Sequence, residues 1–434
     1  MRHGAAVEAN ARALERIAVG DEPAAIAILE AALALAPEPV LAVNLGRLLW
    51  RHGDLARALA LLEAAAAAQP ASTAAWLNLA DARAAAGDIG AEAAYRRALL
   101  LEPERAEIHW SLALDLLIRG EWQRAWPHFA WRARHPAVRR RPAAFPTLAE
   151  LSRPHGPTLL WSNEGVGEDL RYARLLAPLA DCIGPLVVEA DRRLVGLLTR
   201  SLPGVTVVPR TWPPAPETAT RAIAAQATPT DILPLLRPRP DALPGSPAWL
   251  TAEPALTAQL RRRYRSWGRG PVVGLSWRST GTPFATAKSV PIALFAPLLA
   301  DPDVVFVDLQ YGDADPDRDA LPAAGRLRRD PEVDPLRDLD AFAAQVAAMD
   351  LVISSSSTTV HMAGALGVPV WTLVHRGPPV TPYWLAGRPD TPWYPTMRVW
   401  RQAVPGVWGP VMADVAAAFG RWRGARRDDD GATP

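Results

Sequence analysis

Apolar positions over residues 1–136 recur every three or four residues, in stretches separated by short polar turns. This spacing predicts a series of amphipathic helices. The turns are evenly placed, because a glycine followed by an acidic residue recurs at Gly20, Gly53, Gly87 and Gly120. Prolines that end the second helix of each pair recur at the same interval, at Pro37, Pro70, Pro103 and Pro136. A fixed period of about 33 residues predicts a solenoid, here of about four helical hairpins over residues 1–136.

Polar and aromatic residues keep the same period. Asn44, Asn78 and Ser111 each lie nine residues before a turn glycine, and Trp76 and Trp110 are separated by one full period. These spacings resemble the tetratricopeptide repeat, and the resemblance implies a protein or peptide partner for this domain. Asn44 and Asn78 have two interpretations. They are amides on a concave surface that bind an extended peptide, or they satisfy hydrogen bonds within their own hairpin.

A basic segment follows the repeats. Residues 137–157 contain Arg139, Arg140, Arg141 and Pro142. A run of arginines is able to bind phosphate or nucleic acid, but a charged, proline-containing run between two domains is more typical of a solvated linker. We therefore interpret residues 137–157 as a linker.

From Thr158 onward the hydrophobic period changes. Short apolar runs alternate with amphipathic stretches, which predicts βαβ units and a parallel sheet. The first half, residues 158–250, has expected strands at Thr158–Ser162 and Pro185–Val188 and an expected helix at Asp169–Ala180. Residues 202–254 are proline-dense and are expected to be irregular.

The second half, residues 251–424, repeats this alternation. It opens with an expected helix near residues 251–267, and strands are expected at Val272–Trp277, Val304–Leu309, Leu351–Ser354 and Val368–Val374. Residues 425–434 are expected to form a disordered tail. The fold class is therefore α plus α/β, an all-α repeat domain followed by two Rossmann-like lobes. A cleft between two such lobes, at the carboxyl ends of the strands, is a natural site for a nucleotide.

Composition and charge exclude several classes of protein. The 434 residues carry 47 basic and 45 acidic side chains, so no overall positive charge points to nucleic acid. A single cysteine, Cys182, forms no internal disulfide and fits a reducing, cytoplasmic compartment. No signal peptide is evident. The uncharged run Leu351–His375 is long enough for a membrane helix, but its serines, threonines, glycines and proline favour a strand, loop, helix and strand, so no transmembrane segment is expected.

Two glycines and two acids lie between the first strand and the first helix of the α/β region: Gly165, Gly167, Glu168 and Asp169. A dinucleotide-binding motif would place a third glycine where Leu170 stands, and two carboxylates at a helix start would repel a pyrophosphate. The acids either complement the helix dipole or supply a general base facing the acceptor side. Glu168 is the better base candidate, because Gly167 immediately precedes it.

In the second half, the corresponding helix start has hydroxyl residues in place of the two acids. Hydroxyl residues from Ser354 to Thr359 follow an apolar strand and lead into an expected helix from about residue 359 to 366. Free backbone N–H groups at that helix start, beside Ser357, Thr358 and Thr359, predict an anion site suited to a pyrophosphate. His361 lies one turn further on, and it either touches the ligand or packs inside the lobe.

The loop Ser276–Ser289 contains the candidate cations. Lys288 is the only lysine in the chain, since 46 of the 47 basic residues are arginine. A GC-rich genome explains why lysine is rare in this chain. It does not explain why the single lysine stands at position 288. A lysine ammonium is a compact charge that suits a phosphate. We interpret Lys288 as a ligand-binding residue, with retention by chance as the alternative.

Five segments of the α/β region together resemble a known family. They are Leu351-Val-Ile-Ser, the run Thr358–Trp371, Ser276-Trp-Arg-Ser with Lys288-Ser-Val-Pro, Asp308-Leu-Gln-Tyr-Gly, and Pro392-Trp-Tyr-Pro-Thr. They are similar to bacterial tetratricopeptide-repeat proteins with a GT-B glycosyltransferase domain, related to the heptosyltransferases and more distantly to O-GlcNAc transferase. The segments Trp161–Leu176 and Gly120–Arg132 also match, so the similarity covers nearly the whole chain.

This resemblance implies a glycosyltransferase with a nucleoside-diphosphate-sugar donor, inversion at the transferred sugar, a protein or glycan acceptor, and neither a metal nor another cofactor. Glu168 would be the base toward the acceptor, beside Gly165, Gly167 and Asp169. The donor would be bound by residues of the second lobe, with Lys288 also acting in catalysis: Ser276, Arg278, Lys288, Gln310, Tyr311, Ser357, Thr358, Thr359 and His361. Asp-x-Asp triplets such as Asp313/Asp315 arise often in acidic loops, and we assign no metal to them.

One departure from the family pattern favours other functions. Many relatives carry an aspartate where this chain has Ser355 and Ser356. Loss of that carboxylate favours a protein-interaction scaffold with a catalytically degenerate GT-B domain. A sugar-nucleotide epimerase of similar two-lobed shape is a further alternative, which the appended repeats disfavour.

Overall fold

A computed structural model describes the chain over residues 2–135, 145–148, 155–162, 164–211, 213, 218, 223–243, 245–279, 285–321, 326–377 and 381–431. The chain forms two compact units. One contains Met1–Val138 and Gly377–Ala386, and the other contains Arg139–Arg376 and Gly387–Pro434. Most of the expected linker 137–157, including its arginines, lies outside the described residues.

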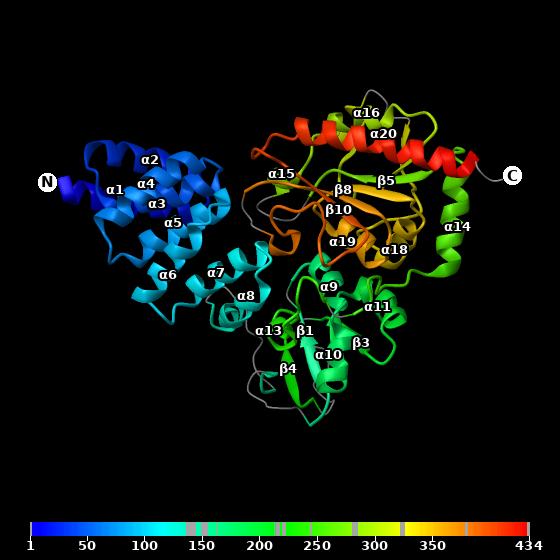
Figure 1. The fold of residues 1–434 in the computed structure, drawn as a ribbon, viewed down its shortest axis with the longest axis horizontal. Coiled ribbons are helices and arrows are strands. Elements are labelled where there is room, and N and C mark those ends of the chain that lie inside the picture. Colours follow the sequence, from blue (N-terminus) through cyan, green and yellow to red (C-terminus); the bar gives the residue numbers. More distant parts are fainter. Residues whose placement is uncertain are drawn as a thin grey trace. The chain divides into compact units, whose positions relative to one another are not determined.

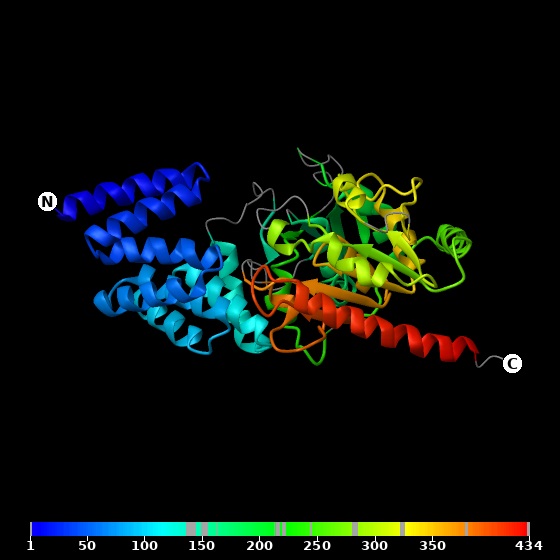
Figure 2. The same ribbon diagram turned by 90° about the horizontal axis from the view of Figure 1, so that it is seen from above.

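The first unit is a stack of antiparallel helix pairs, drawn in blue to cyan in Figure 2. Its helices are α1 (Arg2–Ala18), α2 (Glu22–Leu35), α3 (Pro39–Arg51), α4 (Leu55–Ala68), α5 (Thr73–Ala86), α6 (Ala91–Leu101), α7 (Ala106–Ile118) and α8 (Trp122–Phe129), followed by the 3-10 helix η1 (Ala130–Arg134). The predicted helical repeats are confirmed, since the described residues contain four helix pairs from α1 to α8.

Local chemistry explains the turns within the pairs. The four turn glycines have φ between 74° and 90°, a left-handed conformation that other residues adopt at a cost. In the first two turns the acid after the glycine caps the next helix, since Asp21 and Asp54 accept hydrogen bonds from the backbone N–H groups of Ala24 and Arg57. The sequence period is therefore the period of these turns.

A distant segment completes this unit. The 3-10 helix η6 (Pro382–Trp384) packs against α7, and Trp384 is 1% exposed. The backbone N–H of Ala386 donates to the carbonyl of Ile118 at 2.6 Å. The sequence interpretation placed these residues in the last lobe, so their membership of the helical unit is a correction.

The first lobe of the second unit has a four-stranded parallel sheet in the order β3-β2-β1-β4. Its strands are β1 (Thr158–Trp161), β2 (Leu186–Ala190), β3 (Thr206–Pro209) and β4 (Ala225–Ala227), and its main helices are α9 (Val166–Ala173), α10 (Leu176–Ile183) and α11 (Val195–Ser201). The single helix expected over Asp169–Ala180 is two helices. Two strands lie in the stretch expected to be irregular, because short strands between prolines carry little periodicity.

The second lobe has a six-stranded parallel sheet in the order β10-β9-β8-β5-β6-β7. Figure 1 labels its strands β5, β8 and β10. Its strands are β5 (Val272–Ser276), β6 (Val305–Asp308), β7 (Leu327–Arg328), β8 (Leu351–Ser355), β9 (Val370–Val374) and β10 (Met397–Arg401). Its main helices are α14 (Pro254–Arg265), α15 (Ala285–Lys288), α17 (Asp315–Asp319), α18 (Leu339–Ala347), α19 (Thr358–Ala365) and α20 (Gly409–Gly431). Four of these strands and the helices α14 and α19 match the predicted positions.

The C-terminal helix differs from expectation. α20 continues through Gly431, into the residues expected to form a tail. It packs on the second sheet because Trp408, Met412, Val415 and Phe419 belong to the same buried cluster as β5, β8 and β9. Within the described residues, no helix is both long enough and apolar enough to cross a membrane.

The strand order of the second sheet has one point of reversal. The chain proceeds outward from β5 to β6 and β7 on one side, and from β8 to β9 and β10 on the other. The order therefore reverses between β5 and β8. In open parallel sheets ligands bind beyond the carboxyl ends of the strands at such a reversal.

Candidate functional site

Predicted donor-binding residues gather at the carboxyl ends of β5, β6 and β8. Ser276 is the last residue of β5, Gln310 follows β6, and Ser357 follows β8. The register pairs Ser276 with Ser354 and Leu275 with Asp308, so these three strand ends are neighbours. The topology thus brings together three segments that are distant from one another in the sequence.

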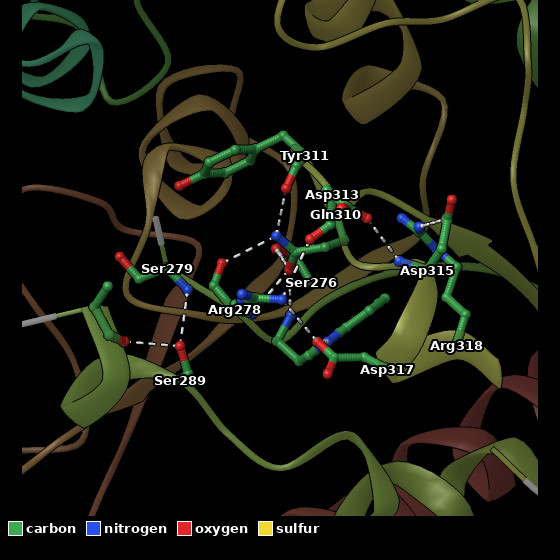
Figure 3. A network of polar contacts seen from close by, with 12 residues as sticks. Ser276, Arg278, Ser279, Ser289, Gln310, Tyr311, Asp313, Asp315, Asp317 and Arg318 are labelled. Atoms are coloured by element: carbon green, nitrogen blue, oxygen red, sulfur yellow. Dashed lines mark hydrogen bonds and ion pairs between the residues drawn. The ribbon is translucent and has the colours of Figure 1, made fainter. Parts of the chain in front are cut away.

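Gln310 holds the loop after β5 in place (Figure 3). Its side-chain oxygen accepts hydrogen bonds from the Ser276 hydroxyl at 3.0 Å and from the backbone N–H groups of Trp277 and Arg278 at 3.0 and 2.8 Å. Its side-chain nitrogen donates to the carbonyls of Arg278 and Tyr311. The side chain is 5% exposed. Gln310 therefore shapes the site through the protein, whereas the ring of Tyr311 extends away from this amide (Figure 3).

The start of α19 has the features of an anion site. Its N-cap residue Ser357 makes no side-chain capping hydrogen bond. The hydroxyls of Ser355 and Thr359 are buried without a hydrogen-bond partner among the described residues. Uncapped N–H groups and unpaired hydroxyls at the positive end of a helix dipole favour a negatively charged ligand.

Lys288 is the last residue of α15 and lies within electrostatic range of Glu168 and of His361. Burial lowers the pKa of Lys288, and the Glu168 carboxylate raises it. The charge of Lys288 also acts on His361 in α19, where burial lowers the pKa of the imidazole to about 4. Glu168, Lys288 and His361, predicted separately from three segments, are therefore within electrostatic reach of one another.

Glu168 is paired with an arginine that sequence reasoning did not select. Arg171 donates from Nε to the Glu168 carboxylate at 3.1 Å and also from Nη2. The guanidinium of Arg171 is 4.1 Å from the ring of Tyr172 and 4.6 Å from the ring of Trp393. The Glu168 side chain retains 27% exposure, so the carboxylate is oriented but accessible.

The two lobes touch where α9 meets α19. A Cβ added at Gly167 would lie 2.8 Å from Cδ2 of His361, closer than real Cβ contacts. His361 is 4% exposed, and its Nδ1 lies 2.6 Å from the hydroxyl of Tyr394. The glycine at position 167 thus permits the close approach of the two helices. These contacts match the interpretation of His361 as a packed residue.

Arg174 links further elements of both lobes. It donates to the carbonyls of Pro392 and Trp393 at 3.1 and 2.7 Å, and to the carbonyl of Leu243 at 3.4 Å. Its guanidinium lies 5.4 Å from the ring of Trp249. The cleft expected between the lobes is therefore crossed by packed side chains at this point.

The other acceptor-side residues have local roles. Asp169 is held by a hydrogen bond with Ser162 and by the charge of Arg210, and burial raises its pKa to about 6. Gly165 is the N-cap of α9 and has open space around the position of a Cβ. Of the two acids at this helix start, Glu168 is the one that reaches the residues of the second lobe.

The repeat asparagines bond within the helical unit. Asn44 donates to the side-chain oxygen of Asn10 at 2.7 Å, and Asn78 donates to the carbonyl of Ala74 at 2.8 Å. Asn78 therefore bonds within its own hairpin, as one interpretation expected, whereas Asn44 bonds to the preceding hairpin, which neither interpretation described. Asn10 lies one repeat period before Asn44, so the repeat period would have identified it as the hydrogen-bond partner of Asn44.

Arg171, Arg174 and Tyr394 are the site residues that sequence reasoning missed. Arg171 lies in α9 and Arg174 is the C-cap residue of this helix, at a spacing that puts them near one face. Tyr394 lies in the Pro392-Trp-Tyr-Pro-Thr segment. Within the described residues, no group of three or more His, Cys, Asp or Glu side chains is arranged to hold a metal ion. Metal independence stays a prediction.

Comparisons with known proteins agree with this architecture. The tetratricopeptide repeat family model matches residues 39–82. Protein FlbA of Caulobacter vibrioides is 31% identical over 441 residues, which cover 92% of this chain and 70% of FlbA. The chain belongs to the family of Protein FlbA.

Two solved structures overlap with the chain. E. coli ADP-heptose lps heptosyltransferase II is 16% identical, with a TM-score of 0.44, over 61% of this chain and 99% of that one. A mutant of Thermobaculum terrenum O-GlcNAc transferase is 17% identical, with a TM-score of 0.37, over 97% of this chain and 90% of that one. At these TM-scores neither overlap establishes a shared activity.

Proposed function

We propose that the chain is a GT-B glycosyltransferase that moves a sugar from a nucleoside-diphosphate donor to an acceptor, with inversion and without a metal. The observation that carries the proposal is the convergence of Glu168, Lys288 and His361 beside the uncapped start of α19. A carboxylate, an ammonium and an anion-binding helix start supply the base and the leaving-group site that sugar transfer requires.

The donor diphosphate would lie at the start of α19. The bond between the sugar C1 and the diphosphate oxygen breaks during transfer, and its electron pair stays on the diphosphate. The Lys288 ammonium, the free N–H groups of α19 and the hydroxyls of Ser355 and Thr359 would stabilise that developing charge. Because these groups are already in place, little reorganisation accompanies the reaction.

The acceptor would approach the exposed edge of Glu168. As the acceptor oxygen bonds to the sugar C1 from the face opposite the diphosphate, its proton passes to the Glu168 carboxylate. The Arg171 guanidinium holds that carboxylate from the other side. His361 is neutral at pH 7, since burial lowers its pKa to about 4, and it adds no charge to the site.

Substitution of Lys288 tests the donor site. In Lys288→Ala, the affinity for nucleoside diphosphates should fall by roughly ten- to a hundredfold, as expected for loss of a charged hydrogen bond. Isothermal titration calorimetry with ADP, GDP, UDP and CDP measures this change. Arg265→Ala is the matched control, because Arg265 is an exposed cation of α14 in the same lobe. Unchanged affinity in Lys288→Ala would remove this residue from the mechanism.

A second candidate function is a protein-interaction scaffold with an inactive transferase domain. Ser355 and Ser356 favour it, because the family pattern that the sequence resembles has an aspartate at this place. Incubation of the wild-type chain with nucleotide sugars separates the two functions. Release of a nucleoside diphosphate supports the transferase, whereas a chain that binds no nucleotide sugar is the scaffold.

A further inference from the structure

A cavity of about 570 Å³ lies in the second lobe, beside the loop that Gln310 holds. It is lined by residues of that loop, of α15 and of α17. Its volume falls within the range of small-molecule sites. The transfer mechanism above assigns it no role.

The polar groups of this cavity have unused hydrogen-bonding capacity. Asp317 accepts from the Trp277 indole N–H at 2.9 Å through Oδ2, while its Oδ1 accepts no hydrogen bond from the described residues. Arg278 uses Nη1 for the carbonyl of Asp313 at 3.2 Å and lies 3.5 Å from the Asp317 carboxylate. Its Nε and Nη2 make no hydrogen bond with the described part of the chain. A free acceptor and free donors thus lie side by side (Figure 3).

The rest of the lining combines hydroxyl residues, Ser279, Thr286 and Ser289, with apolar ones. Trp277, Val290 and Ile292 line the cavity, and all three are buried because they belong to the core of the lobe. The indole of Trp277 is fixed by its bond to Asp317. A flat ring that is apolar on its faces and polar at its edge matches such a lining.

The position of the cavity connects it to the donor site. Ala285, Thr286 and Ser289 line it, and Lys288 lies between them in sequence and faces Glu168 and His361. One short helix therefore borders the cavity and carries the ammonium that is proposed to bind the phosphates. A nucleoside bound in the cavity would place its phosphates beside Lys288.

We propose that this cavity binds the base of the donor nucleotide and that the base is guanine. Guanine offers two adjacent N–H donors on one edge. One would bond to the free Oδ1 of Asp317, and the other would share Oδ2 with the Trp277 indole. Guanine also has acceptors O6 and N7 on the next edge, which suit an arginine. Asp317 and Arg278 supply this pair of groups. Adenine, cytosine and uracil each lack a ring N–H next to an exocyclic amino group. Cytosine and uracil also have a single ring, which leaves more of the apolar lining uncovered.

This inference rests on the proposed function and names its substrate class. The first test is calorimetry of the full chain with GDP, ADP, UDP and CDP. GDP should bind at least about tenfold more tightly than the other three, since a bidentate contact discriminates bases by about that factor. Lys288→Ala should weaken all four, because it acts on the phosphates.

Asp317→Asn gives the second test. Xanthine carries a carbonyl in place of the guanine amino group. An asparagine amide can donate a hydrogen bond to that carbonyl, whereas a carboxylate can only accept one from the guanine amino group. The variant should prefer xanthosine diphosphate over GDP, inverting the order in the wild type. Asp319→Asn is the matched control, since Asp319 lies on the same helix, is exposed and makes no hydrogen bond or ion pair with a described side chain. A misfolded variant loses both ligands and does not invert the order.

Several outcomes would overturn the inference. Equal affinity for the four diphosphates, or tighter binding of CDP or UDP, refutes the guanine assignment and leaves the transferase proposal standing. An Asp317→Asn variant that keeps the preference of the wild type refutes the role of Asp317. If none of the four diphosphates binds, the base site and the proposed function fail together.

Discussion

Glu168 is a carboxylate that a neighbouring arginine orients. Its pairing with Arg171 leaves part of the side chain exposed beside Lys288 and His361. At the level of single residues, this position makes it the group best placed to accept a proton from an acceptor hydroxyl.

Glu168→Gln should lower the rate of nucleoside diphosphate release from the donor by about 10² to 10⁴, the usual contribution of a general base. The affinity for the nucleoside diphosphate should stay the same, because glutamine keeps the size and one oxygen of the side chain. Single-turnover kinetics and calorimetry measure the two quantities. Glu164→Gln, in the same loop, serves as the control and should retain the activity. A Glu168→Gln enzyme with full turnover would assign the base to another group.

Some of these residues could be predicted from the sequence. Lys288 stands out as the only lysine, and Glu168 follows a glycine pair at a helix start. The contacts of Gln310 could not be predicted, because they depend on how two distant loops close on one another. In the sequence, Arg171 has the pattern of a solvent-exposed helix residue. Its contact with the ring of Trp393 depends on the fold, which brings a distant segment beside it.

At the scale of elements, the contact of α9 with α19 depends on a glycine. Gly167→Ala should lower the free energy of unfolding by about 1–3 kcal/mol, the usual cost of an overpacked contact. The added methyl group collides with the His361 ring, which is fixed by Tyr394. Thermal unfolding followed by circular dichroism measures the effect.

Gly420→Ala is the control for this substitution. Gly420 lies inside α20 with open space around it, so the same methyl group should raise stability by about 0.5–1 kcal/mol through helix propensity. Equal melting temperatures for Gly167→Ala and the wild type would show that the two helices separate easily.

Elements differ in how well the sequence predicts them. The repeats were predictable because one turn chemistry recurs through four hairpins. The buried strands β5, β6, β8 and β9 were predictable from apolar runs. The strands β4 and β7 have three and two residues and contain no such run, so their pairing with longer neighbours is what defines them.

At the scale of the whole molecule, buried acids link stability to pH. Burial raises the pKa of Asp81, Asp115 and Asp169 to about 6, above the ordinary value of 3.8. The folded chain therefore binds more protons than the unfolded chain between about pH 4 and 6. The contribution of these groups to stability is present at low pH and is lost as the pH rises through 6. Glu92 has the opposite effect on the pH dependence of stability, but mainly below this pH range, because its pKa is lowered to about 2.

Asp81→Asn should therefore raise the melting temperature more at pH 7.5 than at pH 5. The amide keeps an acceptor for the Tyr95 hydroxyl, which lies 2.7 Å from Asp81, but it never carries a charge. Differential scanning calorimetry of the full chain at both pH values measures the difference. Asp319→Asn should change neither value, and an equal effect of Asp81→Asn at both pH values would contradict the linkage.

The segment Gly377–Ala386 has a consequence for how the gene can be divided. The chain leaves the helical unit at residue 138, returns at residue 377 and leaves again after residue 386. A shortened protein that begins at Arg139 would therefore carry Trp384 without the α7 surface that covers it. A recombination event that replaced the repeats with those of another protein would also have to replace the segment Gly377–Ala386. We therefore expect the two units to stay together in evolution.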